Sequence, residues 1–244
     1  MEEDVVAVVD AYWEARLGVD RVALRGGGVH VVAAPLGAND AMSVLLDETC
    51  IVVVPADEVE SAQAALVGLD AREAFTEDTL RMLVGGDACI DGPSWHSYAD
   101  GWTFLGAPDG AVAQVDGGDI SLLTFLEDND VADWAESGFP RDPASADPET
   151  AQFWVLREHG RVAAAGNLTE WRGLPADVGV LTSPAERGQG LAIRVVATMV
   201  AAALPAVGVV RYRALASNVA SLAVARRLGF EPYGQNYRCR RTTG

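Results

Sequence analysis

The chain contains 244 residues, of which half are hydrophobic and 22% are charged, a composition typical of folded globular proteins. Its 35 acidic and 18 basic residues give a formal net charge of −17, which disfavours binding to nucleic acids and to anionic membranes, since both require a cationic surface. All 18 basic residues are arginine, which excludes a lysine Schiff base, a lysine nucleophile and the lysine of a phosphate-binding loop. We therefore expect no nucleic-acid partner and no membrane partner.

Cysteine usage and the N-terminus predict a cytoplasmic location. The three cysteines, Cys50, Cys89 and Cys239, are widely separated and form no pair with the spacing of a metal site. Unpaired thiols are typical of a reducing compartment. The acidic N-terminus lacks the basic region of a secretory signal, and no apolar run reaches the ~18 residues that a membrane span needs. The sequence predicts no bound metal.

The first 115 residues are predicted to form a small α+β module. Apolar residues at helical spacing predict a helix over Val5–Leu17. Short apolar runs predict four strands, at Arg21–Leu24, Val29–Ala33, Met42–Leu46 and Cys50–Val54. We expect further helices from Asp57 or Ser61 to Leu69 and from Thr76 to Val84, followed by an extended segment at Ser94–Tyr98. No motif in this module specifies a chemistry.

A Gly- and Asp-rich segment, Ala107–Asp119, is the predicted boundary of a second domain that spans residues 119–244. After the apolar run Ile120–Leu123, we expect Asn129 or Asp130 to cap a helix that reaches Glu136, and Pro140–Pro148 to form a polar loop. The elements expected next are strands Phe153–Glu158, Arg161–Thr169 and Val178–Thr182, helix Gly188–Leu204, strand Val207–Leu215, helix Asn218–Leu228 and strand Pro232–Cys239. This alternation predicts a mixed α/β sheet with helices on its faces.

The sharpest feature is the turn between the strand that ends at Thr182 and the long helix. Its glycines, Gly188 and Gly190, would let backbone amides approach an anion, and the start of the helix adds its dipole. A Walker-type loop is excluded because the chain has no lysine. The turn does not match a dinucleotide-binding fingerprint. Ile193 stands where the third glycine would be, and the next strand does not end in the acidic residue that the fingerprint needs. An isolated turn of this kind could also be an ordinary helix start.

Two motifs in this region resemble those of one family. The stretch Arg187-x-x-Gly190-x-Ala192 is similar to the Gln/Arg-x-x-Gly-x-Gly/Ala signature of the GNAT superfamily of N-acetyltransferases. Further along, Asn218 to Phe230 resembles the closing helix and Leu-Gly-Phe turn of that superfamily. The resemblance covers residues from about 119 to 241. It implies a GNAT-like fold, a mixed and mostly antiparallel sheet flanked by helices, here preceded by the smaller α+β module.

The resemblance also implies acetyl-CoA as the co-substrate. In the family, the diphosphate of the cofactor lies on the turn and its pantetheine arm pairs with the preceding strand. The residues assigned to the cofactor in this way are Val180, Leu181, Thr182, Arg187, Gly188, Gln189, Gly190, Leu191, Ala192, Asn218 and Ser221. Asn218 is also placed to cap its helix, a role that is compatible with cofactor contact.

The implied reaction is acetyl transfer to an amine by direct attack in a ternary complex. Many family members use a tyrosine, four residues before the glycine of the closing turn, to protonate the leaving thiolate, and this chain has Ala225 there. The candidates for proton transfer are Glu170, Asp177 and Tyr233, although each could equally be a solvated carboxylate or a core tyrosine. The loss of the tyrosine supports an alternative, a non-catalytic acyl-CoA-binding or regulatory module.

The expected partner is a small-molecule amine. The acidic balance would attract a cationic amine, although a GC-rich genome or a salt-rich cytoplasm would also explain that balance. Acetylation of a protein N-terminus or side chain is a further alternative. The first 115 residues could cover the acceptor pocket, mediate contacts in a homodimer or be a degenerate copy of the GNAT fold, and the sequence does not choose among these.

Overall fold

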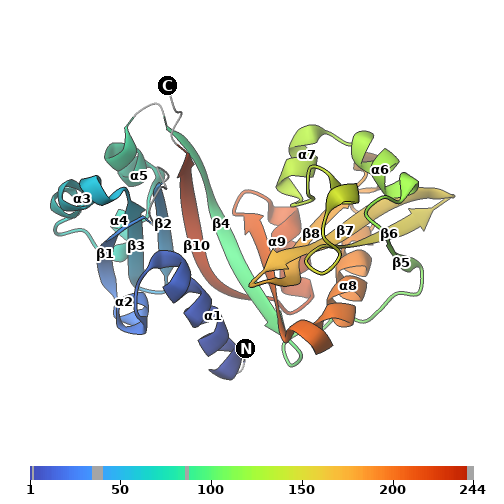
Figure 1. The fold of residues 1–244 in the computed structure, drawn as a ribbon, viewed down its shortest axis with the longest axis horizontal. Helices are drawn as coiled ribbons and strands as arrows, with labels where there is room; N and C mark the ends of the chain where they lie inside the picture. The colour runs from blue at the N-terminus through green and yellow to red at the C-terminus, as the bar shows by residue number, and fades with distance from the viewer. Residues whose placement is uncertain (2, 35–40, 86–87, 241–244) are drawn as a thin grey trace. The chain divides into compact units, whose positions relative to one another are not determined.

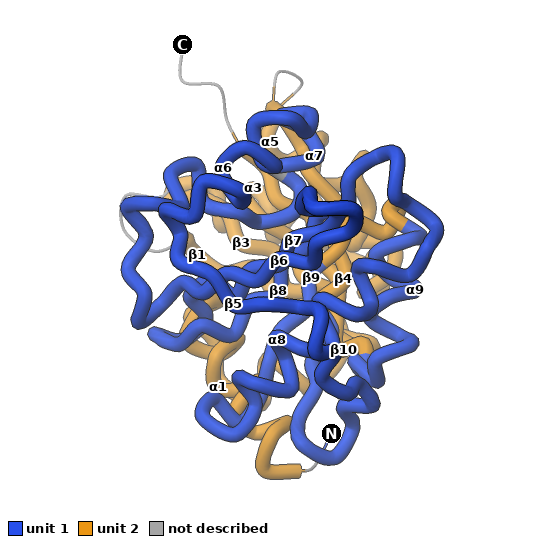
Figure 2. The backbone as a smooth tube through the Cα atoms, turned by 90° about the vertical axis from the view of Figure 1, so that its right-hand side faces the viewer, with its two compact units in different colours: residues 1, 97–213, 219–231 blue, residues 2–96, 214–218, 232–244 orange. Residues whose placement is uncertain are grey.

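The computed structural model describes residues 1, 3–34, 41–85 and 88–240, which form two compact units (Figures 1 and 2). Unit 1 comprises Met1, Ser97–Arg213 and Val219–Glu231. Unit 2 comprises the described residues of 2–96, 214–218 and 232–244. The ranges predicted from the sequence, 1–115 and 119–244, differ from these units. The main reason is the last strand, which pairs with a strand near the N-terminus through partners such as Tyr237 and Ser43.

Unit 2 contains a sheet with the order β1-β3-β2-β10-β4. Its strands are β1 (Gly28–Ala33), β2 (Ala41–Leu46), β3 (Thr49–Val54), β10 (Glu231–Arg240) and the first part of β4 (Cys89–Asp100). Its α-helices are α1 (Glu3–Leu17), α2 (Arg21–Arg25), α3 (Val59–Ala65), α4 (Ala71–Ala74) and α5 (Glu77–Val84). Every residue of β3 is buried, so side chains cover both faces of this sheet.

Two helices of unit 2 differ from the sequence predictions, and both depend on a cap. The strand expected at Arg21–Leu24 is wrong, because these residues form α2, where the carboxylate of Asp20 accepts a hydrogen bond from the amide of Ala23 at 2.8 Å. Helix α4 was not expected. It begins at a capping box in which Asp70 and Glu73 each accept a hydrogen bond from the other's backbone.

Unit 1 contains the strand order β4-β9-β8-β7-β6-β5, with β4 represented by its last residues. The remaining strands are β5 (Val112–Val115), β6 (Gln152–Glu158), β7 (Arg161–Trp171), β8 (Leu174–Thr182) and β9 (Val209–Leu215). The α-helices are α6 (Ile120–Glu127), α7 (Val131–Glu136), α8 (Leu191–Val207) and α9 (Val219–Arg227). Strands β5 to β8 are antiparallel and β9 is parallel to β8. The predicted mixed, mostly antiparallel sheet flanked by helices is confirmed.

Helices cover both faces of the sheet in unit 1 (Figure 1). On one face, Leu122 and Phe125 of α6 pack against Ala165 and Leu181. On the other face lies α8, so close that a Cβ at Gly166 would meet Val195 Cγ1 at 2.6 Å and Met199 Sδ at 2.7 Å. Because successive strand residues point to opposite faces, Gly166 faces α8 while its neighbours on β7 face α6 and α7.

The segment predicted as a boundary, Ala107–Asp119, contains a strand of the sheet. Strand β5 lies inside it and pairs with β6, for example Val112 with Leu156. The apolar run Ile120–Leu123 is the first turn of α6, which Asp119 caps by accepting hydrogen bonds from two backbone amides. The cap expected at Asp130 is confirmed at the start of α7.

None of the helices in the described ranges combines the length and the apolar character needed to cross a membrane.

A buried carboxylate links three elements of unit 2. Asp10 of α1 is 1% exposed and accepts hydrogen bonds from Arg25 Nη2 at 2.5 Å and from Tyr233 Oη at 2.6 Å. The guanidinium of Arg25 also lies over the Tyr233 ring, 4.8 Å from its centroid. Burial raises the pKa of Asp10, but the hydrogen bonds from Arg25 and Tyr233 outweigh it, and the resulting pKa lies below the ordinary value.

Replacing Asp10 by alanine is expected to destabilise unit 2 by about 3 kcal/mol, because Arg25 and the Tyr233 hydroxyl lose their shared acceptor. Since the native pKa is lowered, the stabilisation is present above the unfolded-state pKa of about 3.9 and is lost as pH falls through the native value. Urea denaturation between pH 7 and pH 3 measures both effects. The control is Asp57→Ala at an exposed position, expected to change stability by less than about 0.5 kcal/mol. Equal losses in the two variants would refute this role.

Candidate functional site

The pairing of β8 with β9 ends before β8 does. The two strands pair at Asp177 with Arg211 and at Val178 with Tyr212. Within unit 1, β8 then continues from Gly179 to Thr182 with β7 as its partner. The opposite edge of this part of β8 therefore carries backbone N–H and C=O groups onto which an extended molecule with amide groups can pair.

The chain leaves this edge through a turn that opens α8. Gly188 and Gly190 have φ values of +81° and +78°, which residues with a Cβ rarely adopt. Gly190 is the N-cap of α8 and brings no capping side chain, so it leaves first-turn amides of the helix available. A Cβ built at either glycine would meet no atom of the described residues within 4 Å. The turn therefore presents amides to open space at the positive end of the helix dipole, an arrangement that attracts an anion.

Arg187 adds a cation to the turn. Its Nη2 donates to Asp133 Oδ2 of α7 at 2.6 Å, and its Nε donates to the carbonyl of Thr182 at 3.3 Å. The side chain of Arg187 is 51% exposed, and exposed ion pairs contribute about 1 kcal/mol at most. A more highly charged anion on the turn can therefore displace Asp133 from Arg187.

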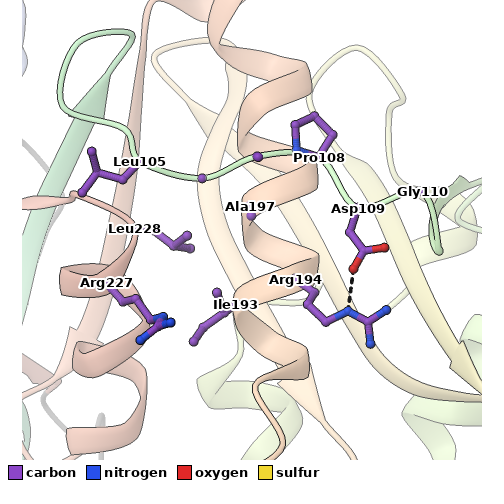
Figure 3. Close-up of a pocket in the computed structure, with 11 residues that line it drawn as sticks. Leu105, Pro108, Asp109, Gly110, Ile193, Arg194, Ala197, Arg227 and Leu228 are labelled. Atoms are coloured by element: carbon purple, nitrogen blue, oxygen red, sulfur yellow. Dashed lines mark hydrogen bonds and ion pairs between the residues drawn. The ribbon is translucent and has the colours of Figure 1, made fainter.

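A pocket of about 670 Å³ lies alongside α8 (Figure 3). The chain segment 105–110 crosses α8 to form one wall, and the others come from Ile193, Arg194 and Ala197 of α8 and from Arg227 and Leu228 at the end of α9. Arg194 Nε donates to Asp109 Oδ2 at 2.5 Å, which lowers the pKa of Asp109, and its Nη1 donates to Glu158. In Figure 3 the guanidinium of Arg227 extends towards Ile193. The volume suits part of a small molecule.

The three residues predicted to transfer protons each have a structural partner. Glu170 is exposed at the end of β7 and accepts a hydrogen bond from the amide of Gly173 at 3.2 Å. Asp177 accepts two hydrogen bonds from Arg211, at 2.8 and 2.5 Å, across the last paired residues of β8 and β9. Tyr233 lies in unit 2, where it donates to Asp10. The partners of Asp177 and Tyr233 come from distant parts of the sequence, which is why spacing alone did not reveal them.

The predicted cofactor residues of unit 1 lie on consecutive segments. Val180 and Thr182 share the face of β8 that points towards α8, whereas Leu181 is buried against α6. The turn and the first residues of α8 follow directly, and the helix begins at Leu191 rather than at Gly188. On α9, the Ser221 hydroxyl is 2.9 Å from Tyr212 Oη, and burial raises the pKa of Tyr212 to about 12. Asn218 belongs to unit 2, where its amide donates to the carbonyl of Leu215 at 3.0 Å.

Sequence reasoning missed Asn167, a fully buried residue of β7. Its Nδ2 donates to the carbonyl of Ser137 at 3.4 Å, while its Oδ1 accepts no hydrogen bond from the described residues. A Cβ at Gly179, its ladder partner, would lie 2.5 Å from Nδ2 and 2.8 Å from Oδ1. The carboxamide therefore lies directly against the backbone of Gly179. A lone amide in the apolar run Ala163–Leu168 was the available signal.

Within the part of the chain that the structure describes, no group of three or more His, Cys, Asp or Glu side chains is arranged to hold a metal ion.

Replacing Gly179 by alanine is expected to cost about 3 kcal/mol of stability, because the new Cβ would lie 2.0 Å from the carbonyl oxygen of Ser137. The matched control is Gly101→Ala, where a Cβ meets no described atom within 4 Å. Chemical denaturation of both variants measures the difference. A Gly179→Ala protein as stable as the control would show that α7 does not sit against β8 in this way.

Comparisons with known proteins found one matching family profile and similar solved structures. Residues 114–231 match the family profile described as an acetyltransferase (GNAT) domain. Among solved structures, one described as an acetyltransferase from the GNAT family of Novosphingobium aromaticivorans aligns with a TM-score of 0.50 at 23% identity, over 64% of this chain and 69% of that one. A GCN5-related N-acetyltransferase from Kribbella flavida aligns with a TM-score of 0.49 at 18% identity, over 98% and 96%. No curated protein sequence matched significantly.

Proposed function

We propose that unit 1, in which residues 114–231 match the GNAT acetyltransferase profile, transfers an acetyl group from acetyl-CoA to an amine. The observation that carries this proposal is the open glycine turn at the start of α8, directly after the unpaired edge of β8. Acetyl-CoA combines a diphosphate with an extended arm that contains amide groups. Each of these two chemical groups has a matching feature in unit 1, and the features occur in the same order along the chain.

The diphosphate would lie on the backbone amides of residues 187–192. The dipole of α8 favours negative charge there, and both turn glycines leave the space open. Arg187 would exchange its exposed ion pair with Asp133 for the more highly charged diphosphate. Binding of the cofactor would thereby release a contact between the turn and α7.

The arm would extend along Val180, Leu181 and Thr182. The backbone groups of Val180 and Thr182 face the opening beyond Val178, whereas those of Leu181 face β7. Ser221 of α9 is a proposed contact of the arm, and Asn218 stays a prediction from the sequence. The nucleotide end would occupy the pocket beside the first turns of α8, where Arg227 supplies a cation for a phosphate group.

In the proposed reaction the amine nitrogen attacks the thioester carbonyl carbon, and the carbon–sulfur bond breaks as CoA leaves as a thiolate. The backbone amide of Thr182, on the unpaired β8 edge, would stabilise the developing oxyanion, because the amide of Leu181 faces its ladder partner Ala165 on β7. An ordinary thiol has a pKa of about 8.5, so a thiolate can leave near neutral pH without a dedicated acid. Ala225, buried at 3% exposure where many family members have tyrosine, is compatible with such a route. Of the predicted bases, we retain Asp177, because it stands beside the opening, two residues before Gly179.

Thermal unfolding with acetyl-CoA tests the proposal. At a hundred times its dissociation constant, the cofactor should stabilise the wild type by about 2.7 kcal/mol, which corresponds to a rise in Tm of roughly 5–10 °C. The double variant Arg187→Glu, Gly190→Trp should show no rise, because a carboxylate and an indole occupy the anion position. Its unliganded Tm and circular dichroism establish that it folds. A wild type that shows no rise at millimolar acetyl-CoA contradicts the proposal.

Two neighbouring arginines provide a matched control in the same experiment. Arg227→Glu should weaken binding of acetyl-CoA more than binding of its analogue without the 3′-phosphate, whereas Arg226→Glu, exposed on the same helix, should affect neither. Equal effects of the two variants on binding would contradict the proposal that the nucleotide end of acetyl-CoA lies in this pocket.

The buried Ala225 also favours the second candidate, a non-catalytic acyl-CoA-binding module. Release of free thiol from acetyl-CoA with a panel of amines separates the two functions. Acetyl transfer predicts amine-dependent release that Asp177→Asn reduces and Glu170→Gln, at an exposed turn, leaves unchanged. Tight binding of acetyl-CoA without release in the presence of any amine would favour the binding module.

A further inference from the structure

Three buried polar atoms around α7 have no hydrogen-bond partner among the described residues: Asn129 Oδ1, Trp134 Nε1 and Asn167 Oδ1. Asn129 lies just before the N-cap of α7, Trp134 lies on the helix, and Asn167 contacts Ser137 at its C-terminal end. Buried polar atoms in folded proteins are almost always satisfied, since leaving them unpaired costs stability. Three exceptions around one short helix indicate a site whose partners arrive with a ligand.

The orientation of the Asn167 carboxamide follows from its surroundings. Its nitrogen faces the carbonyl of Ser137, and the reversed orientation would place two acceptor oxygens against each other. Oδ1 is therefore the atom left without a partner. Gly179 provides the space for this amide, because a side chain at that position would overlap it.

The position of this amide relates it to the proposed reaction. Gly179 is the first residue of β8 beyond its last pair with β9, so Asn167 marks the point at which the strands separate. Asn167 and Gly179 lie on the face of the sheet covered by α6 and α7, and the ion pair between Asp177 and Arg211 lies two residues earlier on that face. The cofactor would enter from the α8 face, so a second substrate that approaches from the α7 face meets Asn167.

We propose that Asn167 Oδ1 accepts a hydrogen bond from the acceptor amine, an inference that rests on the proposed acetyl transfer. This hydrogen bond would select primary amines. An amine that attacks the thioester points its lone pair at the carbonyl carbon and loses one proton, which Asp177, the retained base, would accept. A primary amine keeps a second N–H, and bonding of this N–H to Oδ1 orients the lone pair. Asn167 is thus a positioning and specificity-determining residue. Trp134 Nε1, on the helix that covers the site, supplies a donor for an oxygen elsewhere in the acceptor.

Access to Asn167 requires α7 to move. Trp134 packs α7 against the apolar cluster, but the two polar contacts of this segment with β7 and with the turn are weak ones. The hydrogen bond from Asn167 to Ser137 is long at 3.4 Å, and the ion pair between Asp133 and Arg187 is exposed. A diphosphate on Arg187 would remove the second contact. The cofactor is therefore expected to bind first and the amine second.

The test uses the full chain saturated with CoA and two cations as probes. The side-chain amide resonance of Asn167 is identified by NMR from its absence in Asn167→Leu. Titration with methylammonium, which carries N–H donors, should shift this resonance saturably, whereas tetramethylammonium, which carries none, should not. For every amine that the wild type acetylates, Asn167→Leu should raise the KM of the amine about tenfold or more and leave the KM of acetyl-CoA unchanged.

Stability distinguishes this role from a structural one. Asn167→Leu removes an unsatisfied oxygen but also the long 3.4 Å hydrogen bond to the Ser137 carbonyl, so the two effects oppose each other and its Tm should stay close to that of the wild type. The matched control is Ser43→Ala in unit 2, which also removes a buried oxygen without a described partner and should leave the KM of the amine unchanged. A large fall in the Tm of Asn167→Leu overturns the inference. So does an Asn167 side-chain resonance that does not shift with methylammonium, or that shifts equally with tetramethylammonium. A wild type that binds no acetyl-CoA would instead overturn the proposed function.

Discussion

The parallel pairing of β8 with β9 is the constraint on which the candidate site depends. Asp177 and Arg211 are ladder partners and are joined by two hydrogen bonds, which fixes the last paired residues of the two strands. Beyond Val178, β8 keeps β7 as its partner in unit 1 and exposes its other edge. Three features follow from this arrangement: an edge for an extended ligand, a turn that begins where the edge ends, and a buried amide at the point of separation.

Glycine makes the layers around this point fit together. At Gly166 the missing Cβ lets α8 lie against β7, which brings the first turn of α8 to the end of β8. At Gly179 it leaves space for the Asn167 amide and the Ser137 carbonyl on the other face. At Gly190 a positive φ allows the sharp entry into α8. Packing and chemistry are therefore connected, since the contacts that build the sheet also determine which backbone groups are exposed.

The sequence was informative where function depends on local backbone geometry. The glycine turn, the helix after it and the strand before it are contiguous, and periodicity and glycine spacing predicted these elements. The family was implied separately, by the resemblance of two motifs, and the family profile matches the same region. Side-chain roles were harder to predict, because they depend on partners far away in the chain. Asp177 pairs with Arg211, Arg187 pairs with Asp133, and Tyr233 pairs with Asp10. Asn167 left a signal in the sequence, a lone amide in an apolar strand, but its meaning depends on Gly179 across the ladder. The units were not predictable for the same reason, because β10 returns to pair with β2.

The central claim is that the amides of residues 187–192 hold the diphosphate of acetyl-CoA. Hydrogen–deuterium exchange of the full chain, with and without CoA, tests it most directly, because first-turn amides of a helix that lack a partner exchange rapidly until a ligand protects them. The account predicts that CoA slows exchange at residues 187–192 and along Val180–Thr182, and that the Arg187→Glu, Gly190→Trp variant loses this protection. Exchange at the turn that CoA leaves unchanged, even if protection appears elsewhere in the chain, would contradict the account.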